Sequence, residues 1–249
     1  MWDKIILYSR KDMAGVNIKS ILEDEYDVGN LVAFDDVLTL ESLNRNPETL
    51  CIVASKHASK SGKPCLTCHS PGNYSTADYG GNPRELSYAP AFYLQKALQL
   101  LQEKQEREGI NYEVSFESTH HGPTGLEQPV FFVEVGSTKK EWRDLRACSL
   151  AAEVINELLS YEPVKENKAA IGLGGGHYCR KFTRIKDYAI GHICPKHNLP
   201  YLDEVMLGQM VSKTLPQPDV ALIEWKGLGK EKKRVTGLLE NTGLEIVRV

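Results

Sequence analysis

Short apolar runs alternate with longer amphipathic segments along the whole chain, and this alternation restricts the fold more than any other feature. Runs of strand length at 4–8, 50–55 and 130–135 are separated by helical spacing at 13–23 and 91–107. Such alternation predicts a three-layer α/β/α architecture around a mostly parallel mixed sheet. Further strands are expected at 112–117, 169–173, 188–190, 220–225 and 245–249, and further helices at 141–159, 202–213 and 230–241.

Length and composition point to one domain that spans residues 1–249. A chain of 249 residues can bury a substantial core. No apolar run approaches the roughly 18 residues that a membrane span needs, and the start of the chain resembles a first strand rather than a signal peptide. We therefore expect a cytoplasmic protein without a membrane partner. The sequence leaves the oligomeric state open, with a monomer as one reading.

A polar stretch at about 56–83 interrupts the regular pattern. It is rich in Ser, Thr, Gly and Pro and has no periodicity. Because long structureless loops are uncommon inside compact domains, we expect this one to be functional.

Histidines occur beside glycine at the ends of three predicted strands. His120 and His121 are adjacent, His177 closes a glycine-rich loop, and His192 follows Gly191. Because ligands bind at the carboxyl ends of parallel strands, we expect these histidines to form one site. Imidazole titrates near neutral pH and binds zinc, so the site could perform hydrolysis. The alternative for the adjacent pair is one structural and one exposed histidine.

Glu134 lies inside the apolar run at 130–135, where an unpaired carboxylate is costly. It could orient a histidine, bind a metal ion or act as a general base. The alternative is a position on the solvated face of an edge strand.

The loop at 172–177 contains more glycine than an ordinary turn requires. Its amides, with Gly175 and Gly176 as candidates, could stabilise an oxyanion. No Lys-Ser or Lys-Thr follows, and the even glycine spacing differs from the dinucleotide-binding pattern. A tight structural turn is the alternative.

The six cysteines give weaker signals. Cys65 and Cys68 have the spacing of half a zinc site, which His57 could join, but no second Cys-x-x-Cys completes it. We favour loop cysteines without a metal ion. Cys179 and Cys194 are candidate nucleophiles only because histidines lie near them in the sequence.

The net charge of −3 argues against a general nucleic-acid coat but permits a local basic groove. Basic residues gather at 180–186 and at 226–234. The second run could be the solvated face of a helix or a contact to RNA phosphates.

Taken together, these segments resemble the archaeal and plant-type D-aminoacyl-tRNA deacylase family. The matching pieces are Ala54-Ser55-Lys56-His57, His69-Ser70-Pro71-Gly72-Asn73, Ser118-Thr119-His120-His121-Gly122-Pro123, Glu134-Val135-Gly136-Ser137, Gly174-Gly175-Gly176-His177-Tyr178, Gly191-His192 and residues 228–234. Their order over most of the chain makes the resemblance specific, although each piece alone is weak.

The resemblance implies an enzyme that hydrolyses the ester between a D-amino acid and the terminal ribose of tRNA, with RNA rather than DNA as its partner. It also implies zinc as cofactor and a fold similar to the phosphorylase/hydrolase-like α/β class. His120, His121, His177 and His192 are the candidate metal ligands, and the first three, with Glu134, Gly175 and Gly176, are the candidate catalytic residues. Substrate binding is expected from Lys56, His57, Arg180, Lys181, Lys230, Lys232 and Lys233.

Two other classes of function remain open at this point. One is a zinc-dependent peptidase or amidohydrolase, which needs no basic groove. The other is a tRNA-binding or metal-storage protein without catalysis. The steep salt dependence of tRNA binding would separate the first from a deacylase.

Overall fold

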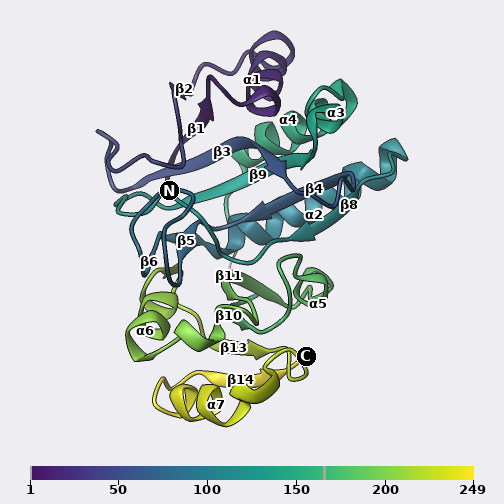
Figure 1. The fold of residues 1–249 in the computed structure, drawn as a ribbon. Helices are drawn as coiled ribbons and strands as arrows, with labels where there is room; N and C mark the ends of the chain where they lie inside the picture. The colour runs from purple at the N-terminus through teal and green to yellow at the C-terminus, as the bar shows by residue number, and fades with distance from the viewer. Residues whose placement is uncertain (1, 165–166) are drawn as a thin grey trace.

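The larger of the two main sheets is built from the N-terminal half of the chain (Figure 1). The computed structural model describes residues 2–164 and 167–249. Six strands pair in the order β2-β1-β3-β9-β4-β8, and neighbours are parallel except for β4 and β9. Their bounds are β1 (Asp3–Ser9), β2 (Leu31–Phe34), β3 (Thr49–Ala58), β4 (Cys65–His69), β8 (Glu113–Phe116) and β9 (Val130–Ser137).

The smaller sheet comes from the C-terminal part of the chain and contains four parallel strands in the order β11-β10-β13-β14. Their bounds are β10 (Lys168–Leu173), β11 (Tyr188–Cys194), β13 (Val220–Ile223) and β14 (Glu245–Arg248). Two short pairs complete the strands, β5 (Gly72–Asn73) with β6 (Glu85–Leu86) and β7 (Ala89–Pro90) with β12 (Thr214–Leu215).

Helices α1, α2 and α4 cover one face of the larger sheet (Figure 1). Phe131 and Val133 of β9 lie in the core beneath them, whereas Val130 and Phe132 belong to a second core that loop residues such as Val37 cover. The helices are α1 (Met13–Tyr26), α2 (Ala91–Glu108), α3 (Lys139–Trp142), α4 (Leu145–Ser160), α5 (Arg180–Thr183), α6 (Glu204–Ser212) and α7 (Lys232–Glu240), with 3-10 turns η1 (Leu199–Tyr201) and η2 (Gly229–Glu231).

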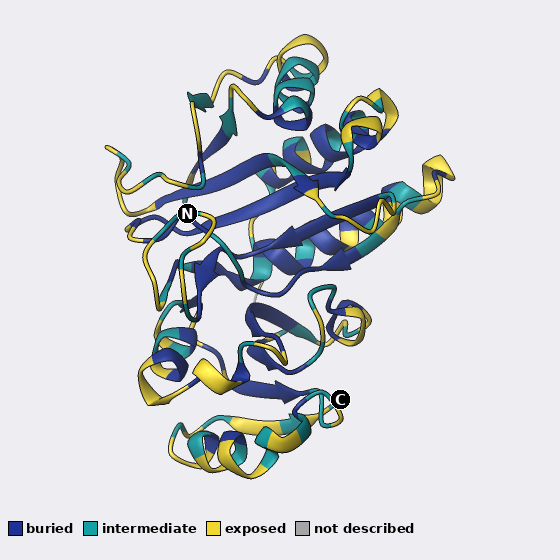
Figure 2. Ribbon diagram, in the orientation of Figure 1, coloured by how far each residue is buried: buried dark blue, intermediate teal, exposed yellow. Residues whose placement is uncertain are grey.

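Helix α2 lies between the two sheets and contacts β4 and β8 on one side and β11 on the other. Its Leu98 shares one core with Ile190 and Leu222 of the smaller sheet. The other face of that sheet packs against α6 and α7, as Ile223 does with Met206 (Figure 2). The smaller sheet is therefore the middle of three layers, and the predicted α/β class with a mostly parallel sheet is confirmed.

The strands form two sheets and not one. The segment after β8 connects them, because it forms hydrogen bonds with both sheets. The amide of Glu117 donates to Cys68 of the larger sheet (3.1 Å), and that of Ser118 donates to the carbonyl of His177 (2.8 Å). The amide of Thr119 then donates to β11 of the smaller sheet. This segment joins the two sheets at their carboxyl ends.

The prediction of a structureless loop at 56–83 is wrong. Strand β3 continues to Ala58, and β4 is an interior strand of the larger sheet. The strand signal is weak because Thr67 and His69 of β4, both fully buried, face a polar site instead of an apolar core. Similarly, the helix expected at 141–159 is broken, and Asp144 caps α4 by accepting from the amide of Arg146 (3.0 Å).

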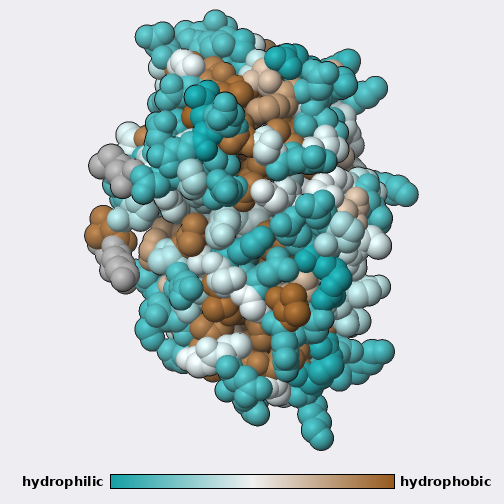
Figure 3. Space-filling model, turned by 90° about the vertical axis from the view of Figure 1, so that its left-hand side faces the viewer, coloured by the Kyte–Doolittle hydropathy of each residue, from teal (hydrophilic) through white to brown (hydrophobic). Residues whose placement is uncertain are grey.

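The surface seen in Figure 3 is largely hydrophilic, with separate apolar patches between the polar side chains. None of the helices among residues 2–164 and 167–249 is long and apolar enough to cross a lipid bilayer.

The position of α2 predicts that its core side chains stabilise both sheets at once. Replacing Leu98, 1% exposed, by Ala should lower the free energy of unfolding by about 2–5 kcal/mol, because the cavity lies in the shared core. Leu145→Ala is the matched control, since Leu145 is 61% exposed and its loss should cost about 0.5 kcal/mol or less. Denaturant unfolding measures both values, and equal losses would contradict the shared core.

Candidate functional site

Five of the seven histidines and two glutamates gather at the junction of the two sheets. This histidine–glutamate cluster consists of His57 in β3, His69 at the end of β4, Glu117, His120 and His121 after β8, Glu134 in β9, and His177 after β10. Most of its members follow strand ends, as the carboxyl-end rule for parallel sheets predicts.

Strand register brings Glu134 between two of the histidines. Glu134 is paired with Ser55 of β3 and Thr67 of β4. Side chains alternate along a strand, so His57 and His69, each two residues further on, share the face of Glu134. Nδ1 of His57 lies 3.4 Å from one Glu134 oxygen and Nε2 of His69 lies 3.8 Å from the other. Glu134 is therefore close enough to two histidines to orient them, and this role, one of those that the sequence suggested, stays a prediction.

Glu117 is the second buried carboxylate and lies at the centre of the cluster, with no side-chain exposure. Its oxygens lie 2.9 Å from Nδ1 of His57, 2.8 Å from Nε2 of His177 and 3.5 Å from Nε2 of His120. Despite these short distances, neither oxygen has a hydrogen-bond partner of suitable geometry within the described part of the chain. Buried polar atoms without such a partner call for an explanation, and a bound ion is one.

Three imidazoles of the cluster are held in the same way, each through its Nδ1. The acceptors are main-chain carbonyls, Ser70 for His69 (3.2 Å), Ser118 for His120 (2.8 Å) and Gly122 for His121 (2.6 Å). A carbonyl only accepts, so each Nδ1 carries a proton, and a neutral ring then keeps a lone pair on Nε2. For His69, burial opposes charge, but the neighbouring Glu134 outweighs it and raises the pKa. Metal-binding histidines usually have this arrangement, with the distal N–H bound to a fixed acceptor.

Burial and neighbouring charges set the protonation of the cluster. Burial lowers the pKa of His120 well below its usual value and that of His121 to about 4, so both rings are neutral at pH 7. Burial also opposes charge on His57, but Glu117 and Glu134 outweigh it and raise the pKa of His57 to about 12. Although burial opposes ionisation of Glu134, its histidine partners lower the pKa to about 2.

These atoms form three groups that could hold a metal ion. The groups are His69, His120 and His121; His57, Glu117 and His177; and His69, Glu117 and Glu134, with ligand atoms within 4.8 Å of one another in each group. Neutral histidines and carboxylates are the donor set that zinc prefers in catalytic sites. The unpaired Nε2 of His69 and the unpaired oxygens of Glu117 fit such an ion.

A cavity of about 560 Å³ opens onto the cluster. Its walls include His57, His120, His121, Glu134 and His177, together with residues of β3, of the loops that follow β1 and β2, and of the segment after β5. A substrate that enters the cavity therefore meets the histidines directly.

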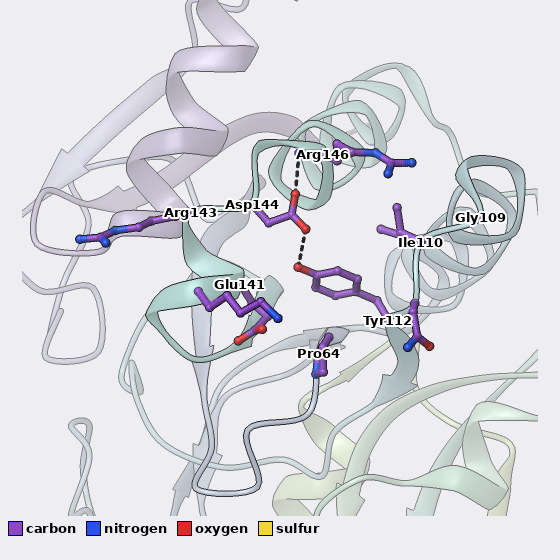
Figure 4. A pocket seen from close by; sticks show the side chains of 10 residues that line it. Pro64, Gly109, Ile110, Tyr112, Glu141, Arg143, Asp144 and Arg146 are labelled. Atoms are coloured by element: carbon purple, nitrogen blue, oxygen red, sulfur yellow. Dashed lines mark hydrogen bonds between the residues drawn. The ribbon is translucent and has the colours of Figure 1, made fainter.

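A separate cavity of about 460 Å³ lies beside the N-terminus of α4 (Figure 4). There the hydroxyl of Tyr112 donates to Asp144 (2.8 Å), and Arg143 and Arg146 point outward. No residue of the histidine–glutamate cluster lines this cavity.

His192 does not join the cluster, which corrects its assignment as a metal ligand. Its Nε2 donates to the carbonyl of Ser87 (2.9 Å), and its Nδ1 accepts from the hydroxyl of Thr119 (3.1 Å). Both nitrogens are thus engaged, and none is available to a metal ion. The side chain is fully buried and helps to hold the connecting segment against β11.

The glycine-rich loop has a structural reason for its composition. A Cβ on Gly174 would lie 2.9 Å from the carbonyl oxygen of Glu224, and one on Gly175 would lie 2.7 Å from the carboxylate of Glu224. Both glycines have positive φ, of +102° and +78°. Neither Gly175 nor Gly176 is among the residues that line the cavity, so their assignment to an oxyanion site stays a prediction.

The basic residues expected to bind substrate lie in different environments. Lys56 lines the cavity beside His57. Arg180 forms an ion pair with Glu113 (2.8 Å), and Lys181 donates to the last carbonyl of the chain. Lys230 lies in η2, and Lys232 and Lys233 begin α7, where Lys232 stands over the ring of Trp225 (5.1 Å).

Two members of the cluster, Glu117 and His69, were not among the predicted site residues. Glu117 carried a usable signal, since a carboxylate between Phe116 and Ser118 at the end of a predicted strand resembles the setting of Glu134. His69 lay in the segment taken for a loop, where its Cys-x-x-Cys-His context suggested other chemistry.

The cysteines take no part in the site. Cys65 and Cys68 are three residues apart in β4, so their side chains point to opposite faces and cannot share one ion. Burial raises the pKa of Cys179 and Cys194, which keeps both thiols protonated and unsuited to nucleophilic attack.

A family model and curated relatives point to one family. Residues 45–247 match the family model described as D-aminoacyl-tRNA deacylase. The D-aminoacyl-tRNA deacylase of Thermococcus kodakarensis is 33% identical over 275 residues, which cover 98% of this chain and 99% of the relative. The protein of the same name from Cenarchaeum symbiosum is 37% identical over 199 residues, covering 79% and 76%. The crystal structure of a conserved protein of unknown function matches with a TM-score of 0.85 at 27% identity, covering 99% and 95%.

The buried, neutral state of His192 predicts a specific loss of stability in acid. Burial lowers the pKa of His192 to about 4, against about 6.5 in an unfolded chain. As the pH falls from about 6.5 to about 4, His192 therefore binds a proton in the unfolded chain but not in the folded chain. Stability falls by up to about 3 kcal/mol over this range. Unfolding of His192→Gln at several pH values, with a chelator present, should show a smaller slope than the unsubstituted protein. Parallel curves would contradict the assignment.

Proposed function

The chain belongs to the D-aminoacyl-tRNA deacylase family, and we propose that its histidine–glutamate cluster is where the ester of a D-aminoacyl-tRNA is hydrolysed. The products are a free D-amino acid and a free tRNA, so the enzyme recycles mischarged tRNA for translation. This role places it in the cytoplasm. The observation that carries the proposal is the set of three histidines whose Nδ1 atoms are fixed by main-chain carbonyls beside an open cavity.

We assign zinc to the Nε2 atoms of His69, His120 and His121. The support is the neutral state of His120 and His121, the common Nδ1 anchoring of the three rings and the unpaired Nε2 of His69. The ligand atoms of His57, Glu117 and His177 also lie close together, but the positive charge of His57 disfavours an ion there. Zinc held by such ligands supplies an activated water at neutral pH.

The two carboxylates keep the remaining histidines in position for proton transfer. Glu117 and Glu134 hold Nδ1 of His57, while its Nε2 is 2.9 Å from the hydroxyl of Tyr178. The ring of His57 is therefore fixed in orientation and positively charged. The side chain of His177 is 37% exposed, against 5% for His57, and its Nε2 lies 2.8 Å from Glu117.

We therefore assign the proton transfer to the leaving ribose hydroxyl to His177. The side chain of His177 can contact substrate while one of its nitrogens faces Glu117. A general acid or base needs both properties, contact with substrate and a defined orientation.

For the RNA part of the substrate, we assign Lys230 and Lys233 to phosphate contacts. Both side chains are exposed, and neither forms an ion pair with a described residue, unlike Arg180 with Glu113. A free ammonium can replace the counterions of a phosphate without first breaking a contact within the protein. Lys56, at the cavity, is our candidate for the phosphate nearest the ester.

The metal assignment predicts a linked loss of zinc and of activity. The unsubstituted enzyme should release tyrosine from D-tyrosyl-tRNA and not from L-tyrosyl-tRNA. His120→Ala should lower kcat/KM by about a hundredfold or more and reduce bound zinc, measured by elemental analysis after dialysis. His197→Ala is the control, because His197 lies outside the three ligand groups. Full activity after zinc has been removed with a chelator would contradict the metal assignment. The proposed deacylase reaction would still stand.

The phosphate assignment predicts a change in salt dependence. Lys230→Ala combined with Lys233→Ala should weaken tRNA binding and reduce the slope of log K against log salt by about 1.4–1.8, since each phosphate contact contributes about 0.7–0.9. Lys19→Ala with Lys168→Ala removes the same charge from lysines that already pair with Glu23 and Glu245. Binding measured from low to moderate salt should separate the two double variants, and equal slopes would refute the assignment.

A further inference from the structure

An exposed tyrosine stands at the edge of the cavity that leads to the histidine–glutamate cluster. Tyr79 is 73% exposed and lines this cavity together with His120 and His121. The other large apolar or aromatic side chains that are exposed among the described residues, such as Tyr201 and Leu145, do not line it. An aromatic ring left in water at the entrance of a site is available to a ligand.

The backbone that carries Tyr79 is fixed to the segment that carries the histidines. The carbonyl of Tyr79 accepts from the amide of Gly122, next to His121 (3.1 Å), and the carbonyl of Gly80 accepts from Nδ2 of Asn73 (2.9 Å). Gly80 has a φ of +79°, and a Cβ there would lie 2.2 Å from the carbonyl oxygen of Leu38. The loop therefore has little freedom to move relative to the cluster.

The ring itself has no partner within the described chain. It takes part in no ring stacking or cation–π contact, and its hydroxyl makes no hydrogen bond. A rigid backbone with an unoccupied ring is a preorganised stacking surface, because binding costs little loop entropy.

We propose that the ring of Tyr79 stacks on the base of the terminal, unpaired adenosine of the tRNA, and so sets the position of the ester at the cluster. This inference rests on the proposed function, because the ester is carried by the ribose of that nucleotide. The base must therefore lie close to the cluster whenever the ester is in place. Unpaired bases commonly stack on aromatic side chains in this way.

The charges at the cavity entrance favour stacking of a base over binding of a phosphate by charge alone. Lys11 and Lys56 line the cavity, but so do Asp35 and Asp36, and Lys11 lies 3.9 Å from Asp35. The acidic side chains offset the attraction of the lysines for phosphate. A stacked base carries no charge and avoids this conflict.

The test uses the full-length enzyme with D-tyrosyl-tRNA and with two uncharged tRNAs, one intact and one lacking its terminal adenosine. Tyr79→Ala should lower kcat/KM about tenfold, mainly through KM, and should weaken binding of intact tRNA to a similar extent. Tyr79→Phe should restore both values because it keeps the ring. Tyr201→Ala, at a tyrosine that is 50% exposed outside the cavity, should change neither. The truncated tRNA should bind equally well to all of these proteins.

The outcomes separate the stacking contact from the proposed function. If Tyr79→Ala behaves like the unsubstituted enzyme, or loses as much affinity for truncated as for intact tRNA, the stacking contact is refuted. If the unsubstituted enzyme does not hydrolyse D-tyrosyl-tRNA, the proposed function fails, and the two binding measurements still decide whether Tyr79 contacts the terminal base.

Discussion

The buried carboxylate of Glu117 is the contact on which the rest of the site depends. Removing a carboxylate from water costs several kcal/mol unless charged or hydrogen-bonding partners replace the solvent. Here the partners are His57 and His177, which come from β3 and from the loop after β10. The charge of one side chain thus ties the larger sheet to the smaller one, and the ionised state of Glu117 requires that both sheets be in place.

The main chain around Glu117 makes the same connection. The segment that follows β8 donates hydrogen bonds to β4, to the loop after β10 and to β11 within three successive residues. Further along, His121 has a left-handed backbone with φ of +47°, which is costly for a residue with a side chain. Close packing of Gly122 against Leu38 holds it there. Strain of this kind persists where surrounding structure fixes it, and it is often found at functional sites.

This arrangement accounts for the division of roles among the histidines. His120 and His121, whose Nδ1 atoms are bound to carbonyls, have low pKa values and present lone pairs, as metal ligands must. The Nδ1 of His69 is held in the same way, but Glu134 raises its pKa. His57, between two carboxylates, is a fixed cation, and His177 is 37% exposed, which is why we propose it for the proton transfer. In the proposed mechanism, one fold junction would supply ligands, a charge and an acid or base from a single residue type, because each ring has a different neighbour.

The sequence alone determined the α/β class, most helices and strands, and the position of His120, His121, His177 and Glu134 in one site. The elements follow from periodicity, which needs only local information, and the carboxyl-end rule gave the expectation of a shared site. That His120 and His177 actually meet depends on the connection between the sheets, because β8 and β10 belong to different ones. Tertiary structure decided which other residues join them. Strand register placed His57 and His69 beside Glu134, and the connection between the sheets brought in Glu117. His192 is as close to a strand end as His177 is, yet its two nitrogens are taken by Thr119 and Ser87. The direction of a side chain at a strand exit depends on which distant segments pack there, and local sequence carries no record of those contacts.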